Sequence, residues 1–108
     1  MTDIKIRQNT TFRLVGELLD SDSKPVGDIT AWTAKCHVRS DTDKPLIAEL
    51  KVSKQSNNFV FTLTPKQTSE LPPGYYLYDI LVKTPDGDIY VAQEGTAQVV
   101  PTITELPL

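Results

Sequence analysis

The stretch ELPPGYYLYDILVKTPDGDIYVAQEG, residues 70–95, decides the fold of this chain. After Gly74, apolar side chains recur at every second position, so that one face carries Tyr76, Tyr78, Ile80 and Val82. A period of two is typical of a β-strand with one buried face. Residues 84–87, TPDG, suit a type I turn with glycine in the left-handed position, which predicts a hairpin closing onto residues 88–94. Gly95 interrupts the returning strand and predicts a bulge or bend there.

A short helical turn is expected just before this stretch. Residues 64–67, TPKQ, form a capping-box pattern with proline at the first helical position, which predicts one helical turn over residues 65–71. Pro72 and Pro73 cannot continue a helix, and Gly74 permits a sharp entry into the following strand.

The period of two recurs in earlier runs, which are separated by turn clusters rich in Asp, Ser, Asn, Gly and Pro. Several short strands with turns at such spacing are typical of a β-sandwich or a barrel. We predict an all-β, antiparallel two-sheet sandwich of about seven strands. One of its strands should cover residues 46–52, and its core should contain Phe12, Trp32, Phe61, Tyr78 and Val82.

Composition indicates one ordinary soluble domain. The 108 residues suffice for a single hydrophobic core, and we expect one domain over residues 1–108, with residues 1–8 as an N-terminal arm or edge strand and residues 101–108 as a short tail. The net charge of −3 leaves no basic surplus for a phosphate backbone, which argues against nucleic acid as a partner. No apolar run has the length of a membrane span or a signal peptide, so no membrane association is expected.

Candidate chemical groups are few. His37 and Cys36 are the only residues of their kinds, and successive strand residues point to opposite sides, so the two cannot act together as base and nucleophile. Cys36 is interpreted as a small buried hydrophobe. The acids of residues 20–22 suggest a calcium loop, but Lys24 and Pro25 occupy positions that need an oxygen ligand and a glycine. We therefore expect no catalytic residue, metal or cofactor, although acids from distant strands could still meet in a cleft.

Two segments of the chain resemble small immunoglobulin-like virion proteins of tailed bacteriophages. Residues 29–41, ITAWTAKCHVRSD, are similar to the LTGWTA-x-x-x-VRS segment of these proteins. Residues 61–99 are similar to their later segment, a T-x-x-LP-x-G-x-Y-x-YD run followed by a P-x-G hairpin. With LIAEL at residues 46–50 between the two, the resemblance covers residues 10–100 in the same order and implies an immunoglobulin-like β-sandwich.

The resemblance also implies a function. It implies a non-enzymatic virion structural protein, made in the host cytoplasm, that binds tail, baseplate or fibre proteins and copies of itself. Two alternatives stay open: a capsid decoration protein bound to the major capsid protein on the head and, from another class, a β-sandwich module that binds carbohydrate or a protein ligand. A carbohydrate platform needs exposed aromatic rings, and only those of Tyr75 and Tyr90 are expected to be exposed.

Outward-facing aliphatic side chains, with Val60 and Leu81 among them, are the candidate contact residues. If they converge on one sheet they form a patch for a partner, and otherwise they are scattered surface or a second small core. We also expect residues 3–7 and the apolar C-terminal tail to contact neighbouring subunits. The predicted interaction residues are Ile4, Ile6, Val15, Leu19, Ile47, Leu77, Tyr90, Ile103, Leu106 and Leu108.

Overall fold

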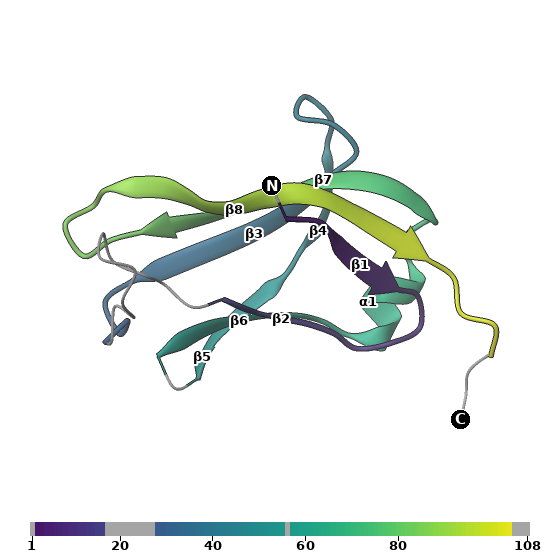
Figure 1. Ribbon diagram of the computed structural model, residues 1–108, viewed down its shortest axis with the longest axis horizontal. Coiled ribbons are helices and arrows are strands. Elements are labelled where there is room, and N and C mark those ends of the chain that lie inside the picture. The colour runs from purple at the N-terminus through teal and green to yellow at the C-terminus, as the bar shows by residue number, and fades with distance from the viewer. Residues whose placement is uncertain (1, 17–27, 56, 105–108) are drawn as a thin grey trace.

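The computed structural model describes residues 2–16, 28–55 and 57–104. Within them the chain forms eight strands and one short helix: β1 (Ile4–Arg7), β2 (Phe12–Gly16), β3 (Thr33–Arg39), β4 (Leu46–Glu49), β5 (Lys51–Gln55), β6 (Asn58–Leu63), α1 (Pro65–Ser69), β7 (Gly74–Lys83) and β8 (Ile89–Val100). The larger sheet has the order β1-β8-β7-β3-β4 and the smaller sheet the order β2-β6-β5. The two sheets face each other as a sandwich (Figure 1), which confirms the predicted fold class.

The core lies between the two sheets, where their inward-facing residues meet. Along β7 the predicted alternation holds, since every second residue from Tyr76 onward is buried. Val60 faces outward as expected, opposite Val15, but it is only 2% exposed and is not part of the core cluster, so it is covered on the outer side of the smaller sheet. Three of the five residues predicted for the core are buried, namely Phe61, Tyr78 and Val82. The other two, Phe12 and Trp32, are half-buried against the same cluster.

One pair of strands departs from the antiparallel prediction. β1 runs parallel to β8, with Ile4 opposite Ala97, and forms an edge of the larger sheet. The pairing joins opposite ends of the chain, so no hairpin turn in the sequence indicates it. It also corrects a predicted contact: Ile6 points into the core and is fully buried, whereas Lys5 and Arg7 are the exposed side chains of β1.

The strand predicted over residues 46–52 is in fact two strands in different sheets. β4 belongs to the larger sheet and β5 to the smaller one. Leu50 lies between them, buried, and its N–H donates to the carbonyl of Cys36 at 3.1 Å. The alternation continues across this crossing, since Ala48 and Val52 both pack against the core. Leu46 is nevertheless 41% exposed, although the pattern placed it on the buried face, because the register of β3 and β4 shifts between Val38 and Arg39 and makes Ile47 the extra residue of a bulge.

The helix α1 begins with the predicted capping box. The Gln67 N–H donates to Thr64 Oγ1 at 3.1 Å, and the Thr64 N–H donates to Gln67 Oε1 at 2.8 Å. The helix ends at Ser69, whereas the prediction extended it to Leu71. No helix in the described part of the chain is long and apolar enough to cross a membrane. Thr68 is buried, and its hydroxyl donates to the carbonyl of Thr10 at 2.8 Å, which ties the helix to the segment between β1 and β2.

The start of β7 contains a tyrosine corner. Tyr76 Oη donates to the carbonyl of Pro72 at 2.6 Å, across the bend made by residues 72–74. A corner of this kind at the corresponding strand is a hallmark of immunoglobulin-like sandwiches. The LP-x-G-x-Y residues of the sequence therefore have a structural role, since they close the corner.

The hairpin between β7 and β8 has the predicted turn, but its bulge lies elsewhere than predicted. Gly87 adopts a φ of 93° and donates its N–H to the carbonyl of Thr84 at 3.0 Å. The register of the two strands shifts between Ile80 and Leu81, which makes Ala92 the extra residue of the bulge.

Gly95 lies within an unbroken β8, so the bend predicted at this residue is wrong. The residue is buried, and a Cβ there would overlap the carbonyl oxygen of Thr2 and lie 2.7 Å from its carbonyl carbon. Glycine is needed because the N-terminal backbone lies directly against β8. The glycine thus marks a close backbone approach between distant parts of the chain.

Candidate interaction surface

The outer face of the larger sheet is the candidate interaction surface, because β3, β7 and β8 place both charged and apolar side chains on it. Residues directly opposite each other on paired strands point to the same side of a sheet. The outward residues of β7 therefore define successive rows across the face, each about 7 Å from the next. From the start of the strand they are Tyr75, Leu77, Asp79, Leu81 and Lys83.

A polar band crosses the middle of this face and consists of Glu94, Asp79, His37 and Glu49. Asp79 lies opposite both Glu94 on β8 and His37 on β3, and His37 lies opposite Glu49 on β4. His37 Nε2 is 3.6 Å from Glu49 Oε2, which is an ion pair when the imidazole is protonated, and Nε2 has no hydrogen-bond partner among the described residues. With three carboxylates to one imidazole, the polar band is mainly acidic.

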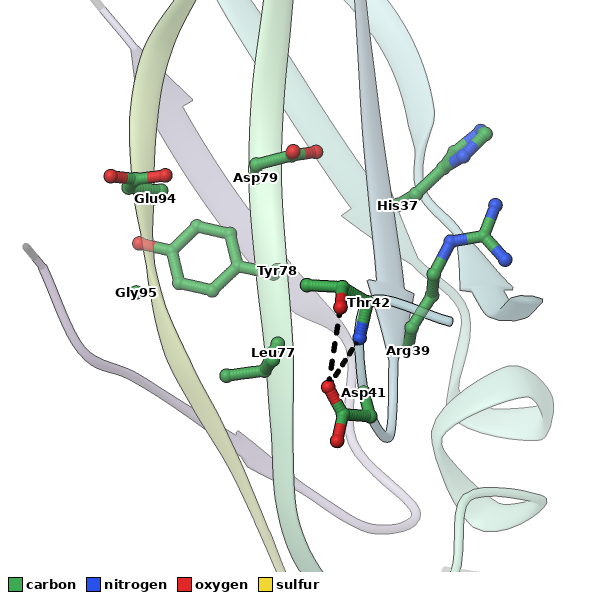
Figure 2. Close-up of a pocket in the computed structure, with 9 residues that line it drawn as sticks. All are labelled: His37, Arg39, Asp41, Thr42, Leu77, Tyr78, Asp79, Glu94 and Gly95. Carbon is green, nitrogen blue, oxygen red and sulfur yellow. Dashed lines mark hydrogen bonds between the residues drawn. The ribbon is translucent and has the colours of Figure 1, made fainter. Parts of the chain in front are cut away.

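An open pocket of about 370 Å³ lies between the polar band and the loop that joins β3 to β4 (Figure 2). Two of its charged lining groups already bond to the chain's own backbone. Arg39 Nη1 donates to the carbonyl of Lys44 at 2.8 Å, and Asp41 Oδ1 accepts from the Thr42 N–H at 2.6 Å. The pocket is therefore lined by charges of both signs, with the arginine and one of the acids engaged locally.

The polar band can offer a partner hydrogen bonds and opposite charges.

Cys36 precedes His37 in β3 but points into the core, so the two do not form a nucleophile and its base. Among residues 2–16, 28–55 and 57–104, no group of three or more His, Cys, Asp or Glu side chains is placed to hold a metal ion. The acids of residues 20–22 lie outside the described residues.

Three aliphatic side chains lie together on the hairpin side of the polar band. Leu81, Ile89 and Val91, which we call the hairpin apolar band, are 40%, 64% and 49% exposed. Val91 lies opposite Leu81, and Ile89 lies opposite Lys83 in the next row. Leu81 and Ile89, with Lys35 and Lys83, line an apolar groove of about 300 Å³. Exposed aliphatic side chains that lie side by side, rather than singly, indicate a contact surface.

The predicted interaction residues do not form one patch. Leu77 is on the outer face of the larger sheet, but Val15 is on β2 in the smaller sheet and Tyr90 points to the opposite side of β8. The other exposed members are Ile47, on β4, and Ile103, which follows β8 and is fully exposed.

The predicted contact role of the N-terminal segment is wrong for Ile6, and that of Ile4 stays a prediction. Ile4 is half-buried against the core and Ile6 is fully buried, because β1 turns both side chains toward the smaller sheet. The backbone of this segment pairs with β8 of its own chain. The other predicted contacts, Leu19, Leu106 and Leu108, lie outside the described residues.

Ile89 and Val91 are absent from the predicted set, although the sequence contains a signal for them. They alternate with Tyr90 in the returning arm of the hairpin, whose turn is evident from TPDG. To place Val91 beside Leu81, one must know which residues of the two hairpin arms lie opposite each other. Beyond Val91, away from the turn, the bulge at Ala92 shifts this pairing by one residue.

The stacked sheets, their strand order and the tyrosine corner define this chain as an immunoglobulin-like β-sandwich. The structure of CopC from Methylosinus trichosporium OB3b is similar over 98% of this chain and 91% of that one, with a TM-score of 0.52 and 15% sequence identity. A GspB Siglec domain is similar over 93% of this chain, with a TM-score of 0.54 and 15% identity, and this chain covers 54% of that one. No protein-family model and no curated protein matches the sequence. At such low identity the similarity concerns the fold alone.

Cys36 is expected to be unreactive in the folded protein. Burial, reinforced by the negative charge of Asp79, raises the pKa of the thiol to about 12. Because the thiolate is the reactive form, an alkylating reagent at mildly alkaline pH should label the folded protein far more slowly than the denatured protein. The pKa of the thiol in the folded state exceeds its free value of 9.0, so the buried neutral thiol contributes fully to the free energy of unfolding below pH 9.0. This contribution is lost as the pH rises from 9.0 toward 12, because only the unfolded chain then releases the proton. Equal labelling rates with and without denaturant would contradict the prediction.

Proposed function

We propose that this chain is a non-enzymatic structural module of tailed-bacteriophage virions, which binds other virion proteins at the tail, the baseplate or a fibre attachment. The observation that carries the proposal is the resemblance of residues 29–41 and 61–99, in the same order, to immunoglobulin-like virion proteins. In the fold these segments include β3 and most of the chain from β6 to β8, so the resemblance involves strands of both sheets.

The surface of the larger sheet supports a role in protein contacts. The hairpin apolar band places three neighbouring aliphatic side chains in solvent, where they cost solvation free energy unless a partner covers them. The polar band beside it supplies charges that can fix the orientation of a partner. An apolar centre with a charged border is the usual anatomy of a protein–protein contact.

The alternative of capsid decoration uses the same surface and differs in the partner, the major capsid protein, and in copy number. A carbohydrate-binding module has less support, because the two exposed tyrosine rings are not neighbours. Tyr75 is 72% exposed at the start of β7, whereas Tyr90 is 40% exposed beside the far end of that strand and points to the other side of the sheet. A stacking platform for a sugar needs rings on one surface.

The test is quantitative mass spectrometry of purified particles of a phage that carries the gene. A tail, baseplate or fibre role predicts about six or twelve copies per particle, as expected of closed symmetric assemblies. Capsid decoration predicts on the order of hundreds of copies, retained in tail-less heads, which serve as the matched control. Presence of the protein in the infected-cell lysate but not in purified particles would contradict both virion roles.

A further inference from the structure

Acidic, apolar and basic side chains follow one another along the outward side of β7. Leu81 is at the centre of this order: Asp79 lies one row before it and Lys83 one row after it, each about 7 Å away. On β8, Glu94 lies beside Asp79, and Val91 lies beside Leu81. Along the strands, the outer face of β7 and β8 thus carries first an acidic row, Asp79 and Glu94, then an apolar row, Leu81 and Val91, and then the basic Lys83.

We propose that this face pairs with the same face of a second copy of the chain. A two-fold axis that runs across the strands at the level of Leu81 packs Leu81 and Val91 against their own counterparts. The same rotation brings Lys83 of each copy over Asp79 of the other, because these two residues lie one row from the axis on opposite sides. Each of these ion pairs forms twice, as every contact does in an isologous interface.

The order of charges favours a second copy over an unrelated partner. Turned about Leu81, the face of β7 is complementary to itself, with acid against base and apolar against apolar side chains. On β8 the same rotation places Glu94 of one copy beside Ile89 of the other, so the complementary charges are those of β7. A different protein would need to present the same three rows independently. The chain has a net charge of −3, so two copies repel each other at long range, and the two Lys83–Asp79 pairs offset this repulsion where the copies meet.

The area that the two copies share is that of a weak, reversible dimer. Rotation about Leu81 overlays only the rows near this residue, and these rows come from β3, β7 and β8, because β4 extends away from the axis beyond His37 and β1 pairs with β8 only from Ala97 onward. Three strands span about 14 Å and the rows from Asp79 to Lys83 about 14 Å, which is below the roughly 800 Å² that each partner contributes to an interface of standard size. The hairpin apolar band lies inside this area, bordered by charged side chains.

The two lysines beside the groove have opposite roles in this arrangement. Lys35 on β3 lies opposite Leu81, level with the axis, so the two Lys35 side chains of a dimer approach each other. Lys83 meets the carboxylate of Asp79 instead. Removal of Lys83 should therefore weaken the dimer, whereas removal of Lys35 should leave it unchanged or strengthen it, although both substitutions remove one positive charge from the same groove.

Sedimentation velocity across a wide range of protein concentrations tests the pairing. We expect the unmodified protein to show a reversible monomer–dimer equilibrium and Leu81→Asp to remain monomeric. Val15→Asp is the matched control, because Val15 is 52% exposed on the smaller sheet and lies outside the face. Circular dichroism and thermal unfolding establish that each variant is folded. A protein that is monomeric at every concentration, or a dimer that Leu81→Asp leaves intact, overturns the proposal.

A charge exchange provides a second test that does not depend on Leu81. Lys83→Asp and Asp79→Lys each place like charges together twice in a dimer, so each variant alone should self-associate at least about tenfold more weakly than the unmodified protein. A mixture of the two variants restores opposite charges at both positions and should form a mixed dimer. Failure of the mixture to associate better than either variant alone overturns the proposed orientation.

The inference is independent of the proposed function. A monomeric protein that still enters virions would overturn the dimer alone, whereas a dimer that is absent from purified virions would overturn the virion role alone.

Discussion

Phe61→Ala is expected to lower the free energy of unfolding by about 3–5 kcal/mol, because it leaves a cavity in the centre of the sandwich. Phe61 is 1% exposed and lies in β6, the middle strand of the smaller sheet, between Leu14 on β2 and Val52 on β5. Its ring centroid is 6.3 Å from that of Phe59, so the substitution removes an aromatic contact as well as buried apolar area.

Denaturant titration monitored by circular dichroism measures this loss. The control is Tyr75→Ala, which truncates an aromatic residue that is 72% exposed and should change the unfolding free energy by less than about 0.5 kcal/mol. If Phe61→Ala costs less than about 1 kcal/mol, the interior is not packed around this ring as described.

Gly95→Ala is expected to destabilise the protein by about 1–3 kcal/mol, since a methyl group has no room at this position. The new Cβ would overlap the carbonyl of Thr2, and that carbonyl accepts a hydrogen bond from Tyr78 Oη at 2.5 Å. The Thr2 N–H also donates to the carbonyl of Glu94 at 2.9 Å. The methyl group must therefore either displace the N-terminal segment and break these bonds or distort β8.

Two comparisons separate the overlap from the general effect of replacing glycine in a strand. Gly16→Ala is the matched control, because the nearest atom to a Cβ there is Phe61 Cε2 at an ordinary 3.7 Å, and its effect should be small. Deletion of residues 1–3 removes Thr2, so Gly95→Ala should cost little in that shortened protein. An undiminished cost in the shortened protein would show that the contact with Thr2 is not the cause.

Local chemistry made much of the architecture predictable. The alternation of Tyr76, Tyr78, Ile80 and Val82 predicted the buried face of β7, because a period of two admits no other regular structure. The TPDG turn and the TPKQ cap act over a few residues, so both were evident without knowledge of the rest of the chain. On the candidate surface, the same alternation placed Leu77 and Leu81 outward.

Tertiary structure decided the features that depend on distant parts of the chain. The parallel pairing of β1 with β8 buries Ile6, and the crossing at Leu50 divides one apparent strand between two sheets. Gly95 is required by Thr2, a residue at the other end of the chain. The rows of the outer face also arise only when β3, β7 and β8 are in register. A sequence pattern reports which side of its own strand a residue occupies, but which strand lies beside it depends on the packing free energy of the whole sandwich.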